Sequence, residues 1–171
     1  VIEIDWDERG RAWVIETRDY PNELKPAKLG KDRIRILEDT DGDGKADKAI
    51  LFADKLSIPT GMCFARGGLI VQMAPHFLFL KDTDGDDKAD VREILFSGWS
   101  TGDTHAGPSN LKYGFDNKIY GCLGGGGFTR DKDRFSAAIW RMGVNGEDVT
   151  LISNLSGNSW GLGISEDFEL F

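Results

Sequence analysis

The chain has 171 residues, 40% of them hydrophobic, which is enough for one ordinary domain with a core of its own. Its 29 acidic residues outnumber 21 Lys and Arg, and the formal net charge of −8 speaks against a nucleic-acid partner or an anionic membrane surface. No apolar run is long enough for a transmembrane segment.

Apolar and polar residues alternate at both ends of the chain, as they do in β-strands. The sequence opens with "VIEIDWDERG", without an initiator Met or a signal peptide, and stops in "EDFELF". We therefore expect residues 1–171 to be a single domain fragment, truncated at both ends.

The first chemically distinctive stretch is "LEDTDGDGKADKAILF", residues 37–52. It places carboxylates at the first, third, fifth and ninth positions of a nine-residue loop, which are Asp39, Asp41, Asp43 and Asp47. Carboxylates so close together repel one another unless a cation lies among them. Calcium takes six to eight oxygen ligands, and this spacing turns successive carboxylates toward one centre, with the backbone carbonyl of Lys45 at the seventh position.

The stretch "LKDTDGDDKADVREILF", residues 80–96, repeats the pattern. Its carboxylates are Asp82, Asp84, Asp86 and Asp90, and its seventh residue is Lys88. The sixth position needs a sharp turn, which Gly44 supplies in the first loop; Asp87 replaces it here, and Asp tolerates the left-handed region better than most residues. Two Ca²⁺ sites are predicted, against the alternative of acidic turns that hold no metal.

The flanks of these loops are not those of an EF-hand. The twelfth position, which carries a bidentate Glu in an EF-hand, is Ile50 in one copy and Glu93 in the other. The flanking "DRIRILE" and "KAILF" are short and rich in β-branched and aromatic residues. Each loop is therefore expected at the tip of a β-hairpin, which disfavours a calcium-signalling module.

A longer repeat surrounds the loops. They recur about 43 residues apart, in the range of propeller blades. A turn followed by an apolar strand also recurs, in the four stretches "DERGRAWVIE", "PTGMCFARGGLIVQM", "AGPSNLKYGFDNKIYGCL" and "SWGLGISEDFELF". In the last three, a short glycine-containing strand comes before the turn. We predict an all-β fold, an incomplete β-propeller of about three to four blades with calcium-binding hairpin loops. A β-sandwich with calcium-loaded hairpins is the alternative.

Cys63 and Cys122 lie in apolar strand-like contexts, where buried free thiols are expected and a disulfide is left open. The five tryptophans, including Trp13 and Trp160, are expected in the cores of the sheets. Residues 18–20, before Pro21, are expected to line a central opening or to form an exposed turn.

The stretch "STGDTHAGPSNLKYGFDNKIYGCLGGGG", residues 100–127, holds His105, one of two histidines. If Asp103 to His105 are extended, both side chains project to one face, where the carboxylate can orient the imidazole as a general base. A simple hydrogen bond within the loop is the alternative for His105. His76 has no acidic neighbour nearby in the sequence and is expected to be structural, and Gly124 to Gly127 are expected to form a flexible loop.

These segments together resemble a known group, the propeller domain of membrane-bound dehydrogenases of the planctomycete and verrucomicrobial type. That group is distantly similar to soluble quinoprotein glucose and sorbosone dehydrogenases. The resemblance spans nearly the whole chain and rests on "DERGRAWVIETRDYPN", both D-x-D-G-D loops, "GDTHAGPSNLKYGFDNKIYG" and "SGNSWGLGISEDFELF".

The resemblance, together with the calcium loops, implies a periplasmic, cell-envelope or extracellular location, and the resemblance adds pyrroloquinoline quinone as a candidate cofactor. His105 stands where the sugar dehydrogenases carry the base that takes the proton of a sugar or alcohol hydroxyl, and Asp103 would orient it. An electron acceptor such as a c-type cytochrome domain would be the partner. "GGGGF" departs from the polar residues that those enzymes place near cofactor and substrate.

The sequence therefore favours part of a calcium-stabilised, quinoprotein-like dehydrogenase propeller, inactive as an isolated fragment. A non-catalytic calcium-binding propeller for a glycan or a protein is the alternative.

Overall fold

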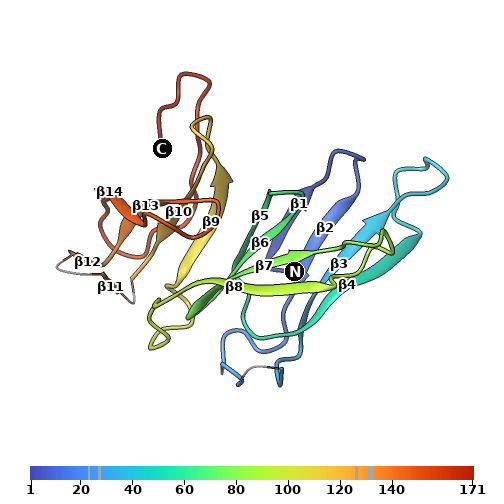
Figure 1. Ribbon diagram of the computed structural model, residues 1–171, viewed down its shortest axis with the longest axis horizontal. Coiled ribbons are helices and arrows are strands. Elements are labelled where there is room, and N and C mark those ends of the chain that lie inside the picture. Colours follow the sequence, from blue (N-terminus) through green and yellow to red (C-terminus); the bar gives the residue numbers. More distant parts are fainter. Residues whose placement is uncertain (23, 27, 126, 131–132) are drawn as a thin grey trace.

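The computed structural model describes residues 1–22, 24–26, 28–125, 127–130 and 133–171, and the described chain is built of strands and loops. Figure 1 shows the strands in chain order. Their bounds are β1 Glu3–Trp6, β2 Ala12–Glu16, β3 Asp32–Glu38, β4 Lys48–Leu56, β5 Gly61–Ala65, β6 Gly68–Met73, β7 His76–Lys81, β8 Val91–Ser97, β9 Pro108–Tyr113, β10 Lys118–Leu123, β11 Phe128–Arg130, β12 Asp133–Phe135, β13 Ala138–Gly143 and β14 Thr150–Asn154.

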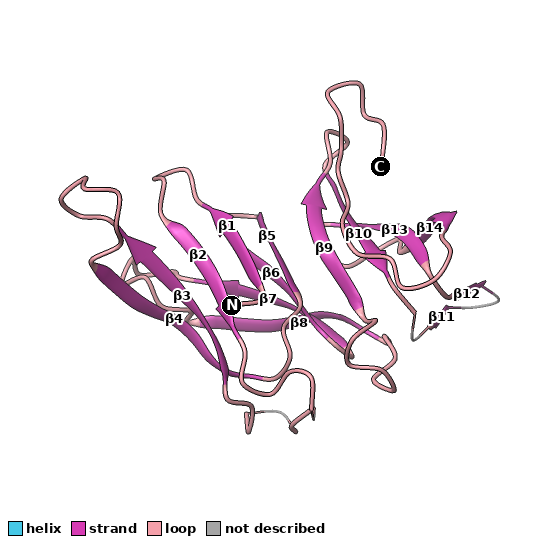
Figure 2. Ribbon diagram, turned by 180° about the vertical axis from the view of Figure 1, so that it is seen from behind, coloured by secondary structure: helices cyan, strands magenta, loops and turns pink. Residues whose placement is uncertain are grey.

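The strands form three four-stranded antiparallel sheets in succession (Figure 2). The first has the order β1-β2-β3-β4, the second β5-β6-β7-β8 and the third β9-β10-β13-β14, while β11 and β12 pair as a separate hairpin. Within the described residues there is no helix that could cross a membrane. The all-β prediction is confirmed, and the propeller stays a prediction.

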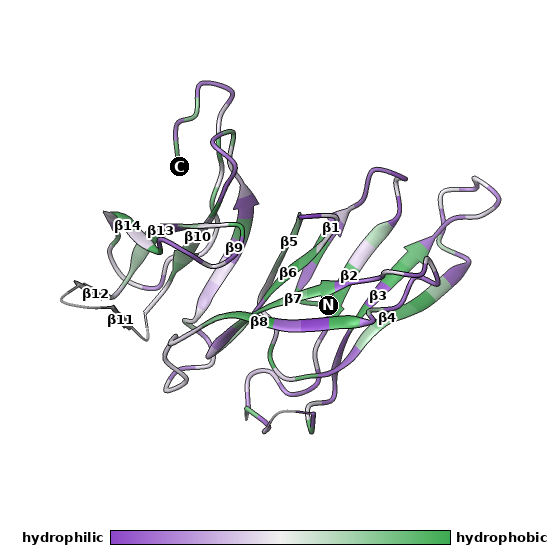
Figure 3. Cartoon of the chain, in the orientation of Figure 1, coloured by the Kyte–Doolittle hydropathy of each residue, from purple (hydrophilic) through white to green (hydrophobic). Residues whose placement is uncertain are grey.

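The middle sheet is covered on both faces because its apolar residues do not alternate with polar ones. Leu69 and Val71 of β6 pack with residues of the first sheet such as Ile34, whereas Ile70 packs with residues of the third sheet such as Trp140. Successive side chains of a strand point to opposite faces, so an unbroken apolar run serves two neighbours at once. Figure 3 shows these hydrophobic strands in green and the more polar loops in purple.

Asp32 holds the connections at one end of the first sheet. Its carboxylate is fully buried and accepts hydrogen bonds from the Thr17 hydroxyl and from the backbone N–H groups of Arg18, Asp19 and Ile58. One side chain therefore fixes the β2–β3 loop and the connection from β4 to β5. Asp19 is itself buried, so an exposed turn at 18–20 was the wrong expectation for this residue.

The expected strands of the first, second and third sheets are present, but the chain end differs from the prediction. "SEDFELF" forms a turn closed by a single β-bridge between Ile164 and Leu170, not a strand. Trp13, Trp99 and Trp140 are buried as expected, whereas Trp6 and Trp160 are exposed and do not belong to a core.

Antiparallel order sends successive connections to opposite ends of each sheet. The two acidic loops join β3 to β4 and β7 to β8, so they lie at one end. The connection from β8 to β9, which carries His105, lies at the other end, beside the β2–β3 loop. The acidic loops and the β8–β9 connection therefore lie at opposite ends of the sheets (Figure 1), and the histidine is a candidate site separate from the acidic loops.

Candidate functional site

The two acidic loops have the same backbone architecture. In the first, the Asp47 N–H donates to the Glu38 carbonyl (3.0 Å), and in the second the Asp90 N–H donates to the Lys81 carbonyl (2.9 Å). These bonds close each loop at the base of its hairpin, as the flanking strand patterns predict.

The first acidic residue of each loop holds the turn in place. Asp39 accepts the N–H groups of Gly42 (2.7 Å) and Gly44 (2.8 Å). Asp82 accepts those of Gly85 (2.7 Å) and Asp87 (2.8 Å). The hydrogen bond from Gly44 is the main reason that the pKa of Asp39 is lowered, and the one from Gly85 acts in the same way on Asp82.

Three carboxylates converge in each loop. Oxygens of Asp39, Asp41 and Asp43 all lie within 4.8 Å of one another, and so do those of Asp82, Asp84 and Asp86. All but Asp82 are exposed, so water and a cation can reach them. Three carboxylate oxygens with room for water are ligands that suit a hard divalent cation.

The ninth-position carboxylates do not belong to these converging groups. Asp47 accepts the hydroxyl of Thr40 (2.8 Å), and Asp90 accepts the hydroxyl (2.9 Å) and N–H (2.7 Å) of Thr83. The hydrogen bond from the Thr83 N–H is the main cause of the lowered pKa of Asp90. A ligand role for Asp47 and Asp90 stays a prediction.

The sequence predicts that the backbone carbonyl oxygens of the lysines at the seventh positions bind calcium, and that ligand role also stays a prediction. Their N–H groups donate to the fifth-position carboxylates, from Lys45 to Asp43 (2.8 Å) and from Lys88 to Asp86 (2.9 Å). The Lys88 ammonium also binds Asp86 (2.6 Å), which raises the lysine pKa. The two loops therefore differ in how much of their negative charge is already paired.

The sixth position is the other difference. Gly44 has φ +85°, and Asp87 takes the same left-handed region with φ +63°. The Asp87 carboxylate accepts a hydrogen bond from Nη1 of Arg11 (2.9 Å), a residue of the β1–β2 connection in the first sheet. No local pattern signals this pair, because Arg11 and Asp87 are far apart in the chain.

His105 and Asp103 come together at the opposite end of the sheets. Nδ1 of His105 lies 3.5 Å from Oδ1 of Asp103, and both side chains are about half exposed (59% and 49%). The chain bends at residues 104 and 105 and is not extended, and the His105 N–H donates to Asp103 (2.8 Å). This backbone bond is the main cause of the lowered pKa of Asp103.

The first sheet supplies the other neighbours of His105. The Tyr20 ring meets the imidazole edge to face, with 5.5 Å between ring centroids, and the Thr104 hydroxyl donates to the Pro21 carbonyl (2.6 Å). The cavity that Asp103 and Thr104 border holds about 10 Å³, far below the roughly 300 Å³ or more of small-molecule sites. His105 is not among the residues that line this cavity.

The remaining sequence candidates have structural surroundings. His76 pairs through Nδ1 with the Ser97 hydroxyl (2.7 Å) between adjacent strands. Cys63 and Cys122 are both buried and free. Of the glycine run 124–127, residue 126 lies outside the described residues.

The class of protein is thus an all-β protein of successive four-stranded sheets, two of which carry matching acidic hairpin loops. The full chain, residues 1–171, matches the model of the family described as "Domain of unknown function (DUF7133)", and the protein belongs to that family. A search of curated proteins finds no match.

Proposed function

We propose that this chain is part of a β-propeller whose blades are the three four-stranded sheets. The sheets follow one another with the first strand of each at the same edge, where β5 lies beside both β1 and β9. The middle sheet is covered on both faces, by apolar residues of its two neighbours. A two-layer sandwich does not account for a sheet buried on both sides by two others, so this packing favours radial blades.

The two acidic loops are proposed as Ca²⁺ sites that stabilise the hairpins. The observation that carries this proposal is the convergence of three carboxylates within 4.8 Å at the same place in two successive sheets. A bound cation relieves the repulsion among these groups, and calcium accepts the mixture of carboxylate, carbonyl and water oxygens that such loops offer.

Calcium titration by calorimetry, with thermal melting in parallel, tests the proposal. The double substitutions Asp41→Asn/Asp43→Asn and Asp84→Asn/Asp86→Asn each remove two charges but keep an oxygen acceptor for the loop backbone. We expect two saturable sites that raise the melting temperature, one of them lost in each variant.

A matched control is Glu166→Gln/Asp167→Asn, which removes two exposed charges from a turn outside the loops. It should retain both sites. Absence of calcium binding in the wild-type chain, or binding that survives both loop substitutions together, would refute the calcium sites.

The second candidate is the dehydrogenase function, with His105 as the base for a sugar or alcohol hydroxyl and Asp103 as the residue that orients it. The contact between these two side chains and their exposure at the sheet end support it. Pyrroloquinoline quinone as the cofactor stays a prediction, and the proposal assigns no quinone contact to these residues. Without turnover, a calcium-stabilised propeller that binds a glycan or a protein remains the alternative.

Quinone-dependent turnover in a longer polypeptide that contains this chain tests the second candidate. We expect His105→Ala to lower turnover by about 10²- to 10⁴-fold without lowering the melting temperature. His76→Ala, at the other histidine, is the control and should retain activity. Equal turnover in the two variants would exclude His105 as the base.

A further inference from the structure

The second acidic loop is attached to the first sheet. The Ala89 N–H donates to the carbonyl of Phe52 in β4 (2.9 Å), and Asp87 binds Arg11 (2.9 Å). For residues 39–47, within the described chain, the side-chain hydrogen bonds stay inside the loop. The two loops therefore share a ligand pattern but differ in what surrounds it.

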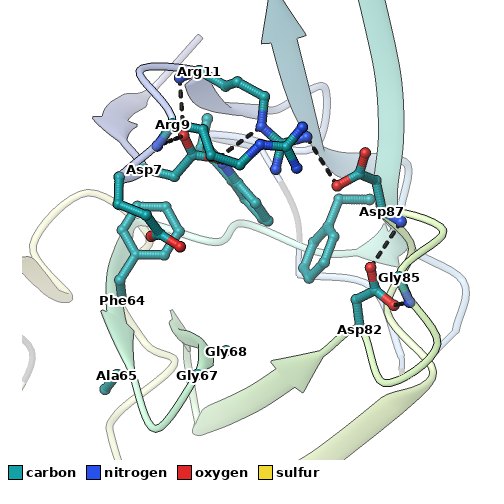
Figure 4. Close-up of a pocket in the computed structure, with 13 residues that line it drawn as sticks. Asp7, Arg9, Arg11, Phe64, Ala65, Gly67, Gly68, Asp82, Gly85 and Asp87 are labelled. Atoms are coloured by element: carbon teal, nitrogen blue, oxygen red, sulfur yellow. Dashed lines mark hydrogen bonds and ion pairs between the residues drawn. The ribbon is translucent and has the colours of Figure 1, made fainter.

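Arg11 is the residue that makes this attachment specific. Its side chain is buried, with 7% of the residue exposed, and binds two carboxylates at once: Nε donates to Asp7 (2.8 Å) and Nη1 to Asp87 (2.9 Å). Asp7 belongs to the β1–β2 turn of the first sheet and Asp87 to the β7–β8 loop of the second, so one guanidinium joins the two sheets (Figure 4). The rigid fork of Arg can do this, whereas the single ammonium of Lys cannot hold the same geometry.

The Asp7 end of this arrangement is anchored in the core between the sheets. The Asp7 carboxylate also accepts Nε1 of Trp13 (3.0 Å). The Trp13 ring packs edge to face against Phe52 of the first sheet and Phe64 of the second, with centroids 4.5 and 5.2 Å apart. Rotation of Arg11 away from Asp87 would therefore disturb the junction of the two sheets.

The Asp87 end leads to the proposed cation ligands. The N–H of Asp87 donates to Oδ2 of Asp82 (2.8 Å), and Asp82 is one of the three converging carboxylates. Arg11, Asp82 and Asp87 all line one cavity of about 500 Å³ (Figure 4). The described contacts thus run from the cation ligands through Asp87 and Arg11 to the sheet junction.

We infer that Arg11 couples cation binding at the second acidic loop to the packing of the first sheet against the second. The inference rests on the proposed calcium function and deepens it, since it gives the two sites different roles. An ion held by Asp82 fixes the turn that presents Asp87 to Arg11, and by reciprocity a closed junction favours the ion. The first loop has Gly44 in place of Asp87, so it carries no carboxylate at the position that binds Arg11 in the second loop.

Amide hydrogen exchange at Ala89 tests the coupling, because that N–H spans the junction. The background Asp41→Asn/Asp43→Asn leaves only the second site, and Asp84→Asn/Asp86→Asn leaves only the first. In the Asp41→Asn/Asp43→Asn background, which keeps the second site, opening of the junction is expected to release the ion. Free calcium at about 100 times the dissociation constant then slows exchange of the Ala89 N–H about 100-fold. In the Asp84→Asn/Asp86→Asn background, which keeps only the first site, calcium should leave the exchange rate of Ala89 unchanged.

The decisive variant is Asp87→Gly in the background that keeps the second site. Gly adopts the positive φ without strain and makes the second loop like the first, so calcium should still bind while its effect on Ala89 exchange is lost. If that variant does not fold, Arg11→Lys is used instead, and it should weaken the calcium effect because it keeps the charge but not the fork.

The outcomes separate the two proposals. If calorimetry shows no calcium binding in either background, the calcium function fails and this inference fails with it. If calcium binds but protects Ala89 equally through either loop, or equally with and without the Arg11–Asp87 pair, only the coupling is overturned.

Discussion

The Thr104 hydroxyl donates a 2.6 Å hydrogen bond to the carbonyl of Pro21, although the two residues belong to connections of different sheets. This bond joins the loop that carries His105 to the β2–β3 loop of the first sheet. Tyr20, next to Pro21, packs its ring against the imidazole. The position of His105 therefore depends on the first sheet, not only on its own loop.

Replacement of Thr104 by Val tests that dependence. Val keeps the shape but removes the hydroxyl, so we expect a loss of about 1 kcal/mol in the free energy of unfolding and weaker contact between the Tyr20 and His105 rings. Urea unfolding and ring-to-ring nuclear Overhauser effects measure the two quantities. Thr101→Val, at an exposed position of the same loop, is the control; an unchanged ring contact in Thr104→Val would show that the bond does not position His105.

Asp32→Asn is expected to destabilise the chain by about 1–3 kcal/mol. Oδ1 of Asp32 accepts the N–H groups of Arg18 and Asp19, and Oδ2 accepts that of Ile58 together with the Thr17 hydroxyl. An Asn oxygen can replace one side of the carboxylate, but its NH₂ group then faces a backbone donor that loses its acceptor.

Chemical denaturation measures this loss, with the exposed Asp167→Asn as the matched change of charge. Equal unfolding free energies for the two variants would mean that the four donors find other acceptors when Asp32 is changed.

The sequence predicted those features whose determinants lie close together in the chain. The acidic loops repeat a nine-residue spacing between strand-like flanks, so both hairpins and the convergence of Asp39, Asp41 and Asp43 follow from local pattern. The final "SEDFELF" has the same local pattern yet forms only one bridge. A strand also requires a partner along its length, whereas the described backbone hydrogen bonds of this segment join Ser165 to Glu169 and Gly163 to Phe171 across its own short turn.

Contacts between distant residues had no comparable signal. Arg11 with Asp87, Tyr20 with His105, and Asp32 with Ile58 each join separate turns or strands, and their geometry depends on how the sheets pack. The residue types are common in turns, so neither spacing nor composition distinguishes them. These pairs include the polar contacts that distinguish the two loops and position the histidine.

Both thiols are expected to be unreactive in the folded chain. Cys63 and Cys122 are buried and free, and burial raises the pKa of the Cys63 thiol to about 12, so almost no thiolate is present at neutral pH. A thiol-reactive disulfide reagent at pH 8 should label neither cysteine within minutes under native conditions and both in denaturant. Rapid native labelling of one equivalent would contradict the burial of that thiol.

Because of Glu3, the free energy of unfolding is expected to fall as the pH rises from 4.5 to about 7. Burial raises the Glu3 pKa from 4.5 to about 7, an effect that Lys112 partly offsets and Asp5 reinforces. Between these values the folded chain keeps the proton while the unfolded chain releases it. The unfolded state therefore binds fewer protons, and the free energy of unfolding falls with increasing pH.

Glu3→Gln removes this titration, so its unfolding free energy should exceed that of the wild type at pH 8, with the difference shrinking as the pH falls toward 4.5. Urea unfolding of both chains across that range measures the difference and cancels groups that titrate equally in the two. Glu8→Gln, an exposed acid of the β1–β2 turn, is the control and should follow the wild type. A Glu3→Gln advantage that is the same at every pH would indicate a packing effect, because only the protonation of Glu3 makes the advantage grow with pH.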